Sequence, residues 1–339
     1  MKLYVGIDLH SNNSVMVILD EKDRVMHERR LPNDLRLILG ALAPHRKNVE
    51  AVAVESTYNW YWLVDGLMEA GYEVRLVNTA AVKIYEGLKY TGDEHDARHL
   101  AHLLRLGILP TGHIYPKAER SIRDLLRKRA QLVHCRTAQA LSIQNLVSRN
   151  SGKGISMNEI RPLSDKAIEH LCQGDTARML AIESNRVVLR CLDEQIKVIE
   201  RKVLAEAKMK PAFENLLTVT GIGKILGMTI MYETGAIERF SKVGCFASYA
   251  RCVNSERFSN GKKKGEGNRK NGNKYLAWAF VEAAHFAVRY SERVRRFYQR
   301  KKAKSNGAVA VKAVAHKLAR ACYHILKERT SFDVERAFA

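Results

Sequence analysis

Short β-rich runs in close succession fill the first part of the sequence, and they constrain its fold more than any other feature. LYVGIDL (3–9) and SVMVILD (14–20) are separated by the polar residues HSNN, and the turn EKDR leads to a third run, VMHERRL. Apolar and β-branched residues at this density, bounded by polar turns, are typical of strands. Connections this short join neighbouring strands, so we expect three strands that form a meander.

The following stretch alternates between strand and helix patterns. VEAVAVES (49–56) predicts a buried strand, WYWLVDGLMEAGY a helix closed by Gly71, and EVRLVN another strand, before helical patterns at 79–88 and 93–106. A meander followed by strand–helix units is typical of a mixed sheet with helices on its faces. This order matches the ribonuclease-H-like scaffold, and it also occurs in other α/β folds.

From Glu119 to about Ala207 the sequence is helical throughout, with a second long helix that begins near Thr176. Apolar residues of this second helix recur every seven positions, at Ile182, Leu189, Ile196 and Val203, with Asn185, Leu192 and Ile199 at the complementary positions. Such a repeat indicates a coiled coil in which the polar Asn could set the register. An amphipathic helix packed inside one domain fits the same pattern.

We expect three parts along the chain. Residues 1–118 form an α/β domain, residues 119–205 a helical and coiled-coil section, and residues 206–339 a mostly α C-terminal domain. The last part opens with NLLTVTGIGKILGMTI and ends in two helices separated by the basic stretch RRFYQRKKAKSNG. We interpret residues 295–304 of that stretch as a loop.

The net charge of +21, from 57 basic and 36 acidic residues, indicates a polyanionic partner. Lysine and arginine that neutralise phosphates release counterions, which gives affinity that does not depend on sequence. An acidic membrane surface is the alternative partner, but the chain shows no basic amphipathic anchor and no lipidation motif. Nucleic acid is therefore the favoured partner.

Other features of the sequence predict a cytoplasmic protein. No apolar run reaches the roughly 18 residues of a membrane-spanning helix, and the start, MKLYVGIDLH, lacks the layout of a secretory signal. The six cysteines include no C-x-x-C pair. This spacing argues against a disulfide framework and against a zinc knuckle.

Four carboxylates suggest a metal site. Asp8 and Glu55 lie at the ends of expected strands, and Asp93 and Asp96 begin an expected helix in GDEHDARHLAHLL, where their spacing puts them on one face. Such a cluster would repel itself unless it bound cations, and Mg²⁺ suits hard oxygen ligands. Each carboxylate taken alone is explained as well by a turn or a helix cap.

Basic and glycine-rich elements are candidates for contact with nucleic acid. TVTGIGKILG resembles the hairpin of a helix-hairpin-helix unit, in which Gly221 and Gly223 free backbone N–H groups for a phosphate and Lys224 adds charge. A plain packing corner between two helices is the alternative. Arg123 and Arg127 belong to a basic face of the first long helix, whose members are Arg120, Arg123, Arg127, Lys128 and Arg136.

The stretch FSNGKKKGEGNRKNGNK (258–274) has the composition of a flexible basic linker. Its lysines, Lys262, Lys263 and Lys264, suit contact with phosphates. A serine that attacks a phosphodiester needs nearby cations to stabilise the developing negative charge. These three lysines follow Ser259 closely in the sequence and could supply that charge. The residues alone do not separate a catalytic Ser259 from an ordinary polar serine.

Taken together, these motifs resemble bacterial insertion-sequence transposases of the DEDD type, the RNA-guided serine recombinases. YVGIDLH, AVES and DEHDAR are similar to that family's metal-binding tetrad, which corresponds here to Asp8, Glu55, Asp93 and Asp96. LLTVTGIGKILG, CFASYA and FSNG are similar to its C-terminal transposase domain, in which Ser259 matches the serine that links covalently to DNA. The resemblance extends over nearly the whole chain.

The resemblance implies a ribonuclease-H-like (RuvC-like) first domain, a coiled-coil section and a separate serine-bearing domain. It also implies Mg²⁺ as cofactor, DNA of the element ends and target as substrate, a guide RNA encoded by the element, and a homodimer or homotetramer at the bacterial nucleoid. One departure concerns the local pattern: ARCVNSERFSNG replaces the Gly-Leu-x-Pro often found before the serine loop. The basic residue that often precedes D-x-x-D in the family corresponds here to Lys89.

We therefore expect a Mg²⁺-dependent recombinase that excises and inserts its own mobile element through a phosphoserine intermediate. Two alternatives remain open at the level of sequence. One is a metal-only nuclease similar to Holliday-junction resolvases, in which the carboxylates act alone. The other is a non-enzymatic nucleic-acid-binding protein whose acidic cluster is structural.

Overall fold

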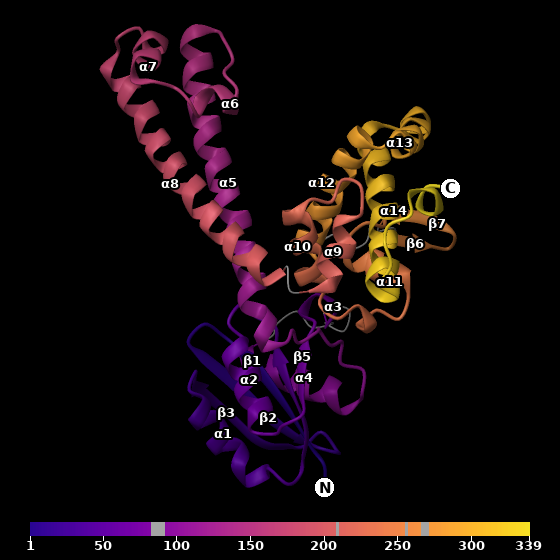
Figure 1. Cartoon of the computed structure of the whole chain (residues 1–339). Helices are drawn as coiled ribbons and strands as arrows, with labels where there is room; N and C mark the ends of the chain where they lie inside the picture. Colours follow the sequence, from indigo (N-terminus) through magenta and orange to yellow (C-terminus); the bar gives the residue numbers. More distant parts are fainter. Residues whose placement is uncertain (83–91, 208–209, 255–256, 266–270) are drawn as a thin grey trace. The chain divides into compact units, whose positions relative to one another are not determined.

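The chain folds into two compact units, Met1–Lys117 and Ala118–Ala339. The computed structural model describes residues 1–82, 92–207, 210–254, 257–265 and 271–339. Figure 1 shows the α/β character of the first unit and the helical character of the second. Lys89, the expected basic residue before the D-x-x-D motif, lies outside the described residues.

A five-stranded mixed sheet forms the centre of the first unit. Its strands are β1 (Leu3–Leu9), β2 (Asn13–Asp20), β3 (Val25–Pro32), β4 (Val49–Glu55) and β5 (Val74–Val77), in the order β3-β2-β1-β4-β5. The meander β1–β2–β3 is antiparallel, whereas β4 pairs parallel with both β1 and β5. The expected meander followed by strand–helix units is therefore confirmed.

Helices pack on both faces of this sheet. On one face, α1 (Leu35–Leu42) and α2 (Tyr61–Glu69) share a core with the alternate residues Leu3, Val5 and Ile7 of β1. On the other face, α4 (Asp93–Arg105) packs against β2 and β4. The sequence pattern did not predict α1, although Asp34 caps it by accepting a hydrogen bond from the backbone N–H of Arg36. Of the helix expected at 79–88, α3 (Thr79–Val82) is described.

Gly6 of β1 allows α4 to approach the sheet closely. A Cβ atom placed on Gly6 would lie 2.0 Å from the carbonyl oxygen of Ala97 and 2.7 Å from the backbone nitrogen of Ala101. Ala97 and Ala101 are themselves small and fully buried. The absence of side-chain bulk on both sides therefore brings the backbone of α4 almost into contact with that of β1.

A pair of long antiparallel helices, α5 (Lys117–Ser151) and α8 (Thr176–Ala207), begins the second unit. The short helices α6 (Met157–Ile160) and α7 (Asp165–Cys172) lie between them in sequence and close their far end (Figure 1). The seven-residue repeat of α8 is buried within the chain, at Ile182, Leu189, Ile196 and Val203. Ion pairs Arg129–Glu200 and Arg136–Asp193, at 2.7 and 2.8 Å, join the two helices, so part of the expected basic face is neutralised internally.

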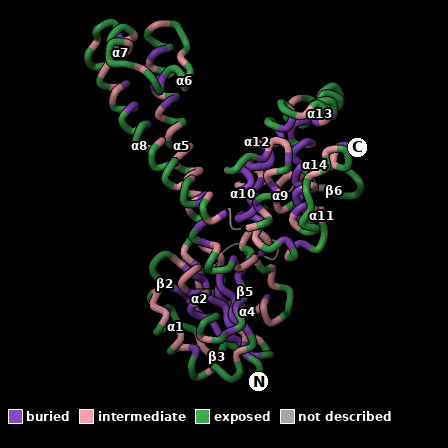
Figure 2. The backbone as a smooth tube through the Cα atoms, viewed as in Figure 1, coloured by how far each residue is buried: buried purple, intermediate pink, exposed green. Residues whose placement is uncertain are grey.

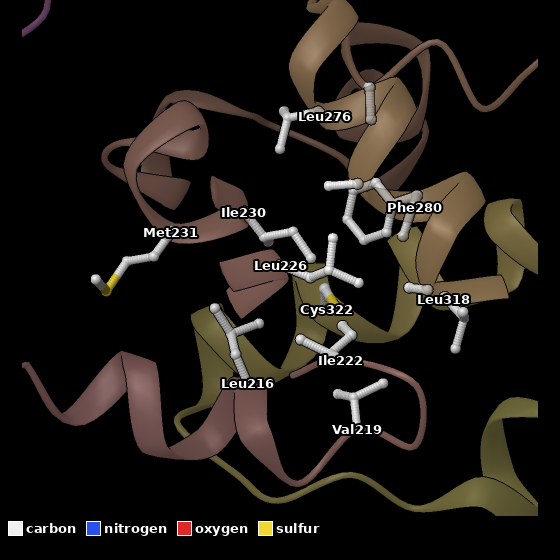
Figure 3. Packing of buried hydrophobic residues seen from close by; sticks show 14 of the residues in the cluster. Leu216, Val219, Ile222, Leu226, Ile230, Met231, Leu276, Phe280, Leu318 and Cys322 are labelled. Atoms are coloured by element: carbon white, nitrogen blue, oxygen red, sulfur yellow. The ribbon is translucent and has the colours of Figure 1, made fainter. Parts of the chain in front are cut away.

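The remaining elements form a helical bundle with one small hairpin. The bundle consists of α9 (Pro211–Leu217), α10 (Lys224–Thr234), α11 (Val243–Tyr249), α12 (Lys274–Tyr290), α13 (Glu292–Lys304), α14 (Gly307–Glu328) and α15 (Val334–Ala337), with a short 3₁₀ turn at Ile237–Arg239; the hairpin consists of β6 (Arg257–Ser259) and β7 (Lys262–Gly265). Figure 3 shows its core, in which Leu226 and Ile230 of α10 meet Phe280 of α12 and Cys322 of α14. Ile122 and Val203 of the long helices belong to the same core.

Buried positions concentrate in the sheet and in this bundle, whereas much of the long helix pair is exposed or half-buried (Figure 2). Among the described residues, no helix has both the length and the apolar character that crossing a membrane requires.

The expectation of a loop at 295–304 is wrong, because these residues belong to α13. Ser291 caps this helix by accepting a hydrogen bond from the backbone N–H of Val294. Val294 and Phe297 are buried, and the Phe297 ring lies 5.4 Å from that of Phe338. The basic composition of the stretch obscured these two anchors, which fix the helix on the bundle and leave its basic side chains on the surface.

The contact between Gly6 and α4 predicts a strong effect of one methyl group. Gly6→Ala should lower the free energy of unfolding by about 1–3 kcal/mol or more, because the added Cβ would overlap backbone atoms that cannot move independently. Gly40→Ala is the matched control: no atom lies within 4 Å of its Cβ position, and its place in α1 favours alanine. Thermal and urea unfolding of the full chain would measure both changes, and a Gly6→Ala protein as stable as the wild type would contradict the close contact.

Candidate metal centre and serine hairpin

The acidic cluster begins at the ends of two parallel strands. Ile7 of β1 pairs with Val54 of β4, so the next residues, Asp8 and Glu55, lie side by side where the strands end. Side chains alternate between the faces of a sheet. Asp8 comes two residues after Gly6, which faces α4, so Asp8 and Glu55 project from the face that α4 covers.

The first turn of α4 brings the other two carboxylates to the same place. Asp93 Oδ2 lies 3.3 Å from Nε2 of His10, and the same nitrogen lies 3.2 Å from Asp8 Oδ2. The charge of Asp96 is close enough to Glu55 to raise its pKa. All four carboxylates singled out in the sequence therefore meet above one end of the sheet.

The electrostatics of the cluster favour a cation. Burial, a hydrogen bond with Asp8 and the charges of Asp8 and Asp96 together raise the pKa of Glu55 to about 8. Asp8 is itself only 3% exposed. Carboxylates this close cannot all ionise near neutral pH unless a positive charge compensates them. The donor set therefore fits a divalent metal ion, which would take the place of the shared proton.

His10 is a site residue that the sequence analysis missed. Its Nε2 atom is buried between the carboxylates, and within the described part of the chain no partner meets it in hydrogen-bond geometry. Single donor atoms of Asp8, His10 and Asp93 lie within 4.8 Å of one another, a spacing suited to one metal ion. The carbonyl oxygen of His10 accepts hydrogen bonds from Asn33 and Asn59, both at 3.0 Å, which fix the residue in place. Its position two residues after Asp8 was the signal that could have found it.

Arg30 of β3 supplies the positive charge nearest to Asp93. Its Nη2 donates to Asp93 Oδ2 at 2.7 Å, and its Nη1 donates to Asn13 Oδ1 at 2.9 Å. The hydrogen bond from Arg30 lowers the pKa of Asp93, and His10 adds to this effect. Asp93 is therefore kept ionised and ready to bind a cation, in contrast to Glu55.

The stretch interpreted as a basic linker contains a β-hairpin. Ser259 is the last residue of β6 and pairs with Lys262 of β7. The two residues between them, Asn260 and Gly261, have φ angles of 50° and 69°. Asn-Gly with two positive φ angles is the type I′ turn that matches the twist of a hairpin. Ser259, Lys262 and Lys264 are exposed, and Lys263 lies on the same strand, β7.

The proposed phosphate-binding hairpin divides into a packed part and an open part. Gly221 has a φ of 95°, and a Cβ there would lie 2.4 Å from the carbonyl oxygen of Ala283, so this glycine serves helix packing. Gly223 caps α10 with open space around it, and Lys224 is exposed in the first turn. Both border a groove of about 620 Å³ that also contains Phe286 and Tyr290.

Arg123 and Arg127 are placed inside the second unit. Both guanidinium groups pair with Glu233 of α10, and the Arg123 side chain is only 8% exposed. Arg127 also stacks on the Tyr275 ring, with 4.6 Å between Cζ and the ring centroid. Neither arginine therefore belongs to an open basic face, and the signal missing from the sequence was the distant acidic partner.

Comparison with known protein families adds independent support from sequence. Residues 5–150 match the DEDD transposase model named for IS110, which spans the acidic cluster and suggests the use of a divalent metal. Residues 213–299 match the model described as "Transposase IS116/IS110/IS902 family", which spans the serine hairpin. A search of curated proteins gave no match. The two family matches show that this chain is an enzyme acting on DNA, a transposase of the IS110/IS116/IS902 family.

Proposed function

We propose that this transposase cuts and rejoins DNA through two groups, the metal centre of the first unit and Ser259 of the second, with a covalent phosphoserine intermediate. The observation that carries most weight is the convergence of Asp8 and Asp93 on Nε2 of His10, with Glu55 and Asp96 beside them. The strand order β3-β2-β1-β4-β5 supports a RuvC-like assignment for the unit that holds them.

Asp8 and Asp93 would hold the metal ion, with Glu55 and Asp96 beside them and His10 as a nitrogen donor. Such an ion, when bound, would supply a positive charge that polarises a phosphodiester. Mg²⁺ is the proposed ion because carboxylate oxygens dominate the site. The imidazole of His10 makes Mn²⁺ the alternative, since nitrogen ligands suit it better than they suit Mg²⁺.

The chemistry assigned to Ser259 is a transesterification. Its Oγ would form a bond to phosphorus while the bond to a DNA oxygen breaks, so that the hydroxyl proton leaves Ser259 and the departing DNA oxygen gains one. A free DNA hydroxyl then attacks the phosphoserine, which restores both the serine and a phosphodiester. Bond energy is conserved, so ATP is not required. The exposed lysines of β7 would lie along the phosphate backbone.

A guide RNA and assembly into a dimer or tetramer are part of the same proposal. The protein would bind such an RNA through its phosphate backbone and would not need to recognise its bases, so a basic surface is sufficient. The basic side chains of α13, together with Gly223 and Lys224 of α10, are candidates for this contact.

A metal-only nuclease is the second candidate function. The observation in its favour is that all four carboxylates belong to the first unit. In that case the carboxylates would direct hydrolysis by water, and no protein–DNA bond would form. Trapping of the protein on a cut strand separates the two mechanisms.

The acidic cluster predicts a specific effect of metal ions on stability. Mg²⁺ or Mn²⁺ at about 100 times Kd should stabilise the wild type by about 2.7 kcal/mol, whereas Asp8→Asn should lose most of this effect. Without metal, Asp8→Asn should be at least as stable as the wild type, because it removes one of the repelling charges. Glu73→Gln, at an exposed surface ion pair of the same unit, is the control and should respond like the wild type.

Thermal unfolding and calorimetric titration would measure these effects with either ion. An Asp8→Asn protein that binds metal as tightly as the wild type would rule out this centre. The comparison of Mg²⁺ with Mn²⁺ would show how far the nitrogen of His10 contributes.

Ser259 predicts a second outcome. Incubated with DNA that carries the element's own ends and with RNA from its non-coding end, the wild type should form a DNA adduct that survives denaturation, and Ser259→Ala should form none. Because Ser259 is exposed, its loss should leave stability within about 0.5 kcal/mol of the wild type. Ser241→Ala, at another exposed serine of the same unit, should form the adduct. Strand cutting that persists in Ser259→Ala would favour the metal-only nuclease.

A further inference from the structure

A fully buried carboxylate links the long helix pair to the base of the serine loop. Glu233 of α10 has 0% of its surface exposed. Its partners come from two places that are distant in sequence: Arg123 and Arg127 of α5, and Asn273, which ends the loop that contains the hairpin and caps α12. Nothing in the metal centre or in the chemistry assigned to Ser259 uses this group.

On one side, Glu233 binds two arginines of α5. Arg127 donates through Nε to Oε1 at 2.6 Å and through Nη2 to Oε2 at 2.9 Å, which is a two-pronged contact. Arg123 donates through Nε to Oε2 at 3.1 Å. Because planar guanidinium–carboxylate pairs fix orientation as well as distance, these bonds set the position of α5 against α10.

On the other side, Glu233 holds Asn273, the residue at which the serine loop ends. Nδ2 of Asn273 donates to Glu233 Oε2 at 2.7 Å, while its Oδ1 accepts from the backbone nitrogens of Tyr275 and Leu276 and so caps α12. Its backbone nitrogen donates to the carbonyl oxygen of Tyr249 at 2.6 Å. Asn273 thus joins the residue before the loop, the end of the loop and the start of α12.

The two ends of the loop, residues 250–272, are closed tightly against each other. Gly272 has a φ of 87°, and a Cβ there would lie 2.4 Å from the carbonyl oxygen of Tyr249. The guanidinium of Arg251 donates to the carbonyl oxygens of Asn271 and Gly272, at 3.1 and 2.9 Å. The loop that contains the Ser259 hairpin therefore begins and ends at residues that are held together around Asn273.

The balance of charges keeps Glu233 ionised. Burial alone would raise its pKa, but the hydrogen bond from Arg127, the charges of Arg123 and Arg127 and the hydrogen bond from Asn273 lower the pKa below its usual value. A buried carboxylate tolerates the loss of a partner poorly, because the remaining charge has no water to solvate it. Glu233 therefore holds Arg123, Arg127 and Asn273 together. A movement of α5 would be transmitted through these hydrogen bonds to the base of the loop.

We propose that Glu233 is a positioning residue for Ser259: it fixes the base of the serine loop to α5, so that one buried group sets both the helix pair and the loop. This inference rests on the proposed role of Ser259 for its catalytic consequence, and on the contacts of Glu233 alone for its structural one.

The test exchanges the carboxylate of Glu233 with the amide of Asn273. Asn273→Asp keeps the cap on α12 but places a second carboxylate against Glu233, so covalent capture of DNA should slow by roughly tenfold or more while DNA affinity stays within about twofold. Glu233→Gln should also slow capture, because it leaves Arg123 and Arg127 without their counter-charge. In Glu233→Gln/Asn273→Asp the amide and the carboxylate have changed places, so the double variant should capture DNA faster than either single variant.

Trypsin cleavage of the full-length protein at the lysines of β7 gives a second measurement that does not depend on any chemistry at Ser259. Cleavage should be faster in Asn273→Asp and slower again in the double variant, because a loosened loop base lets the hairpin unfold locally, and the protease cleaves an unfolded segment faster. Asn306→Asp makes the same substitution at the exposed cap of α14 and should leave cleavage unchanged.

Three results would overturn the inference: wild-type cleavage in Asn273→Asp, a double variant no better than the single ones, or a parallel loss of melting temperature and DNA binding that accounts for the slower capture. Ser259→Ala is assayed beside them. An adduct that persists in Ser259→Ala would reject the proposed nucleophile, while the cleavage pattern would still decide the role of Glu233.

Discussion

Carboxylates at the strand ends of the first unit repel one another, and much of that unit serves to hold them together. The parallel register sets Asp8 beside Glu55, and the bare backbone of Gly6 lets α4 add Asp93 from above. Arg30 offsets part of the negative charge without removing it. The cluster at the strand ends therefore keeps a net negative charge, which favours the binding of a divalent ion. A bound divalent ion would relieve the repulsion between these carboxylates.

The second unit handles a buried carboxylate in the opposite way. Glu233 is surrounded by donors from its own chain, so its charge is balanced without any ligand. Salt and metal ions in solution have little access to such a group, whose partners are fixed by packing. The charge balance of the acidic cluster in the first unit would therefore change when a cation binds, whereas that of Glu233 in the second unit would stay the same. The proposed mechanism uses both properties, since Ser259 would have to keep its position while metal and nucleic acid exchange.

How much of this structure the sequence predicts depends on how far apart in sequence the interacting residues are. Asp8 and Glu55 were found because strand ends are visible as local patterns, whereas His10 was overlooked as part of a polar turn. The helical pattern predicts an open basic face for Arg123 and Arg127, because it cannot show a carboxylate that lies 110 and 106 residues away. The composition of residues 258–274 predicts a linker, whereas the Asn-Gly turn within it is a local signal of the hairpin that contains Ser259. The fold class thus follows from periodicity, and the errors arise where a distant partner or a turn geometry decides.

The two-residue turn at Asn260 and Gly261 has a consequence for the length of the chain around Ser259. Opposed residues of a hairpin place their side chains on the same face, so Lys262 always accompanies Ser259 there. One inserted or deleted residue would shift the register and turn the lysine to the opposite face. A change of length between Ser259 and Lys262 would therefore separate the serine from the lysine that it pairs with. The number of residues between Ser259 and Lys262 thus decides whether their side chains share a face.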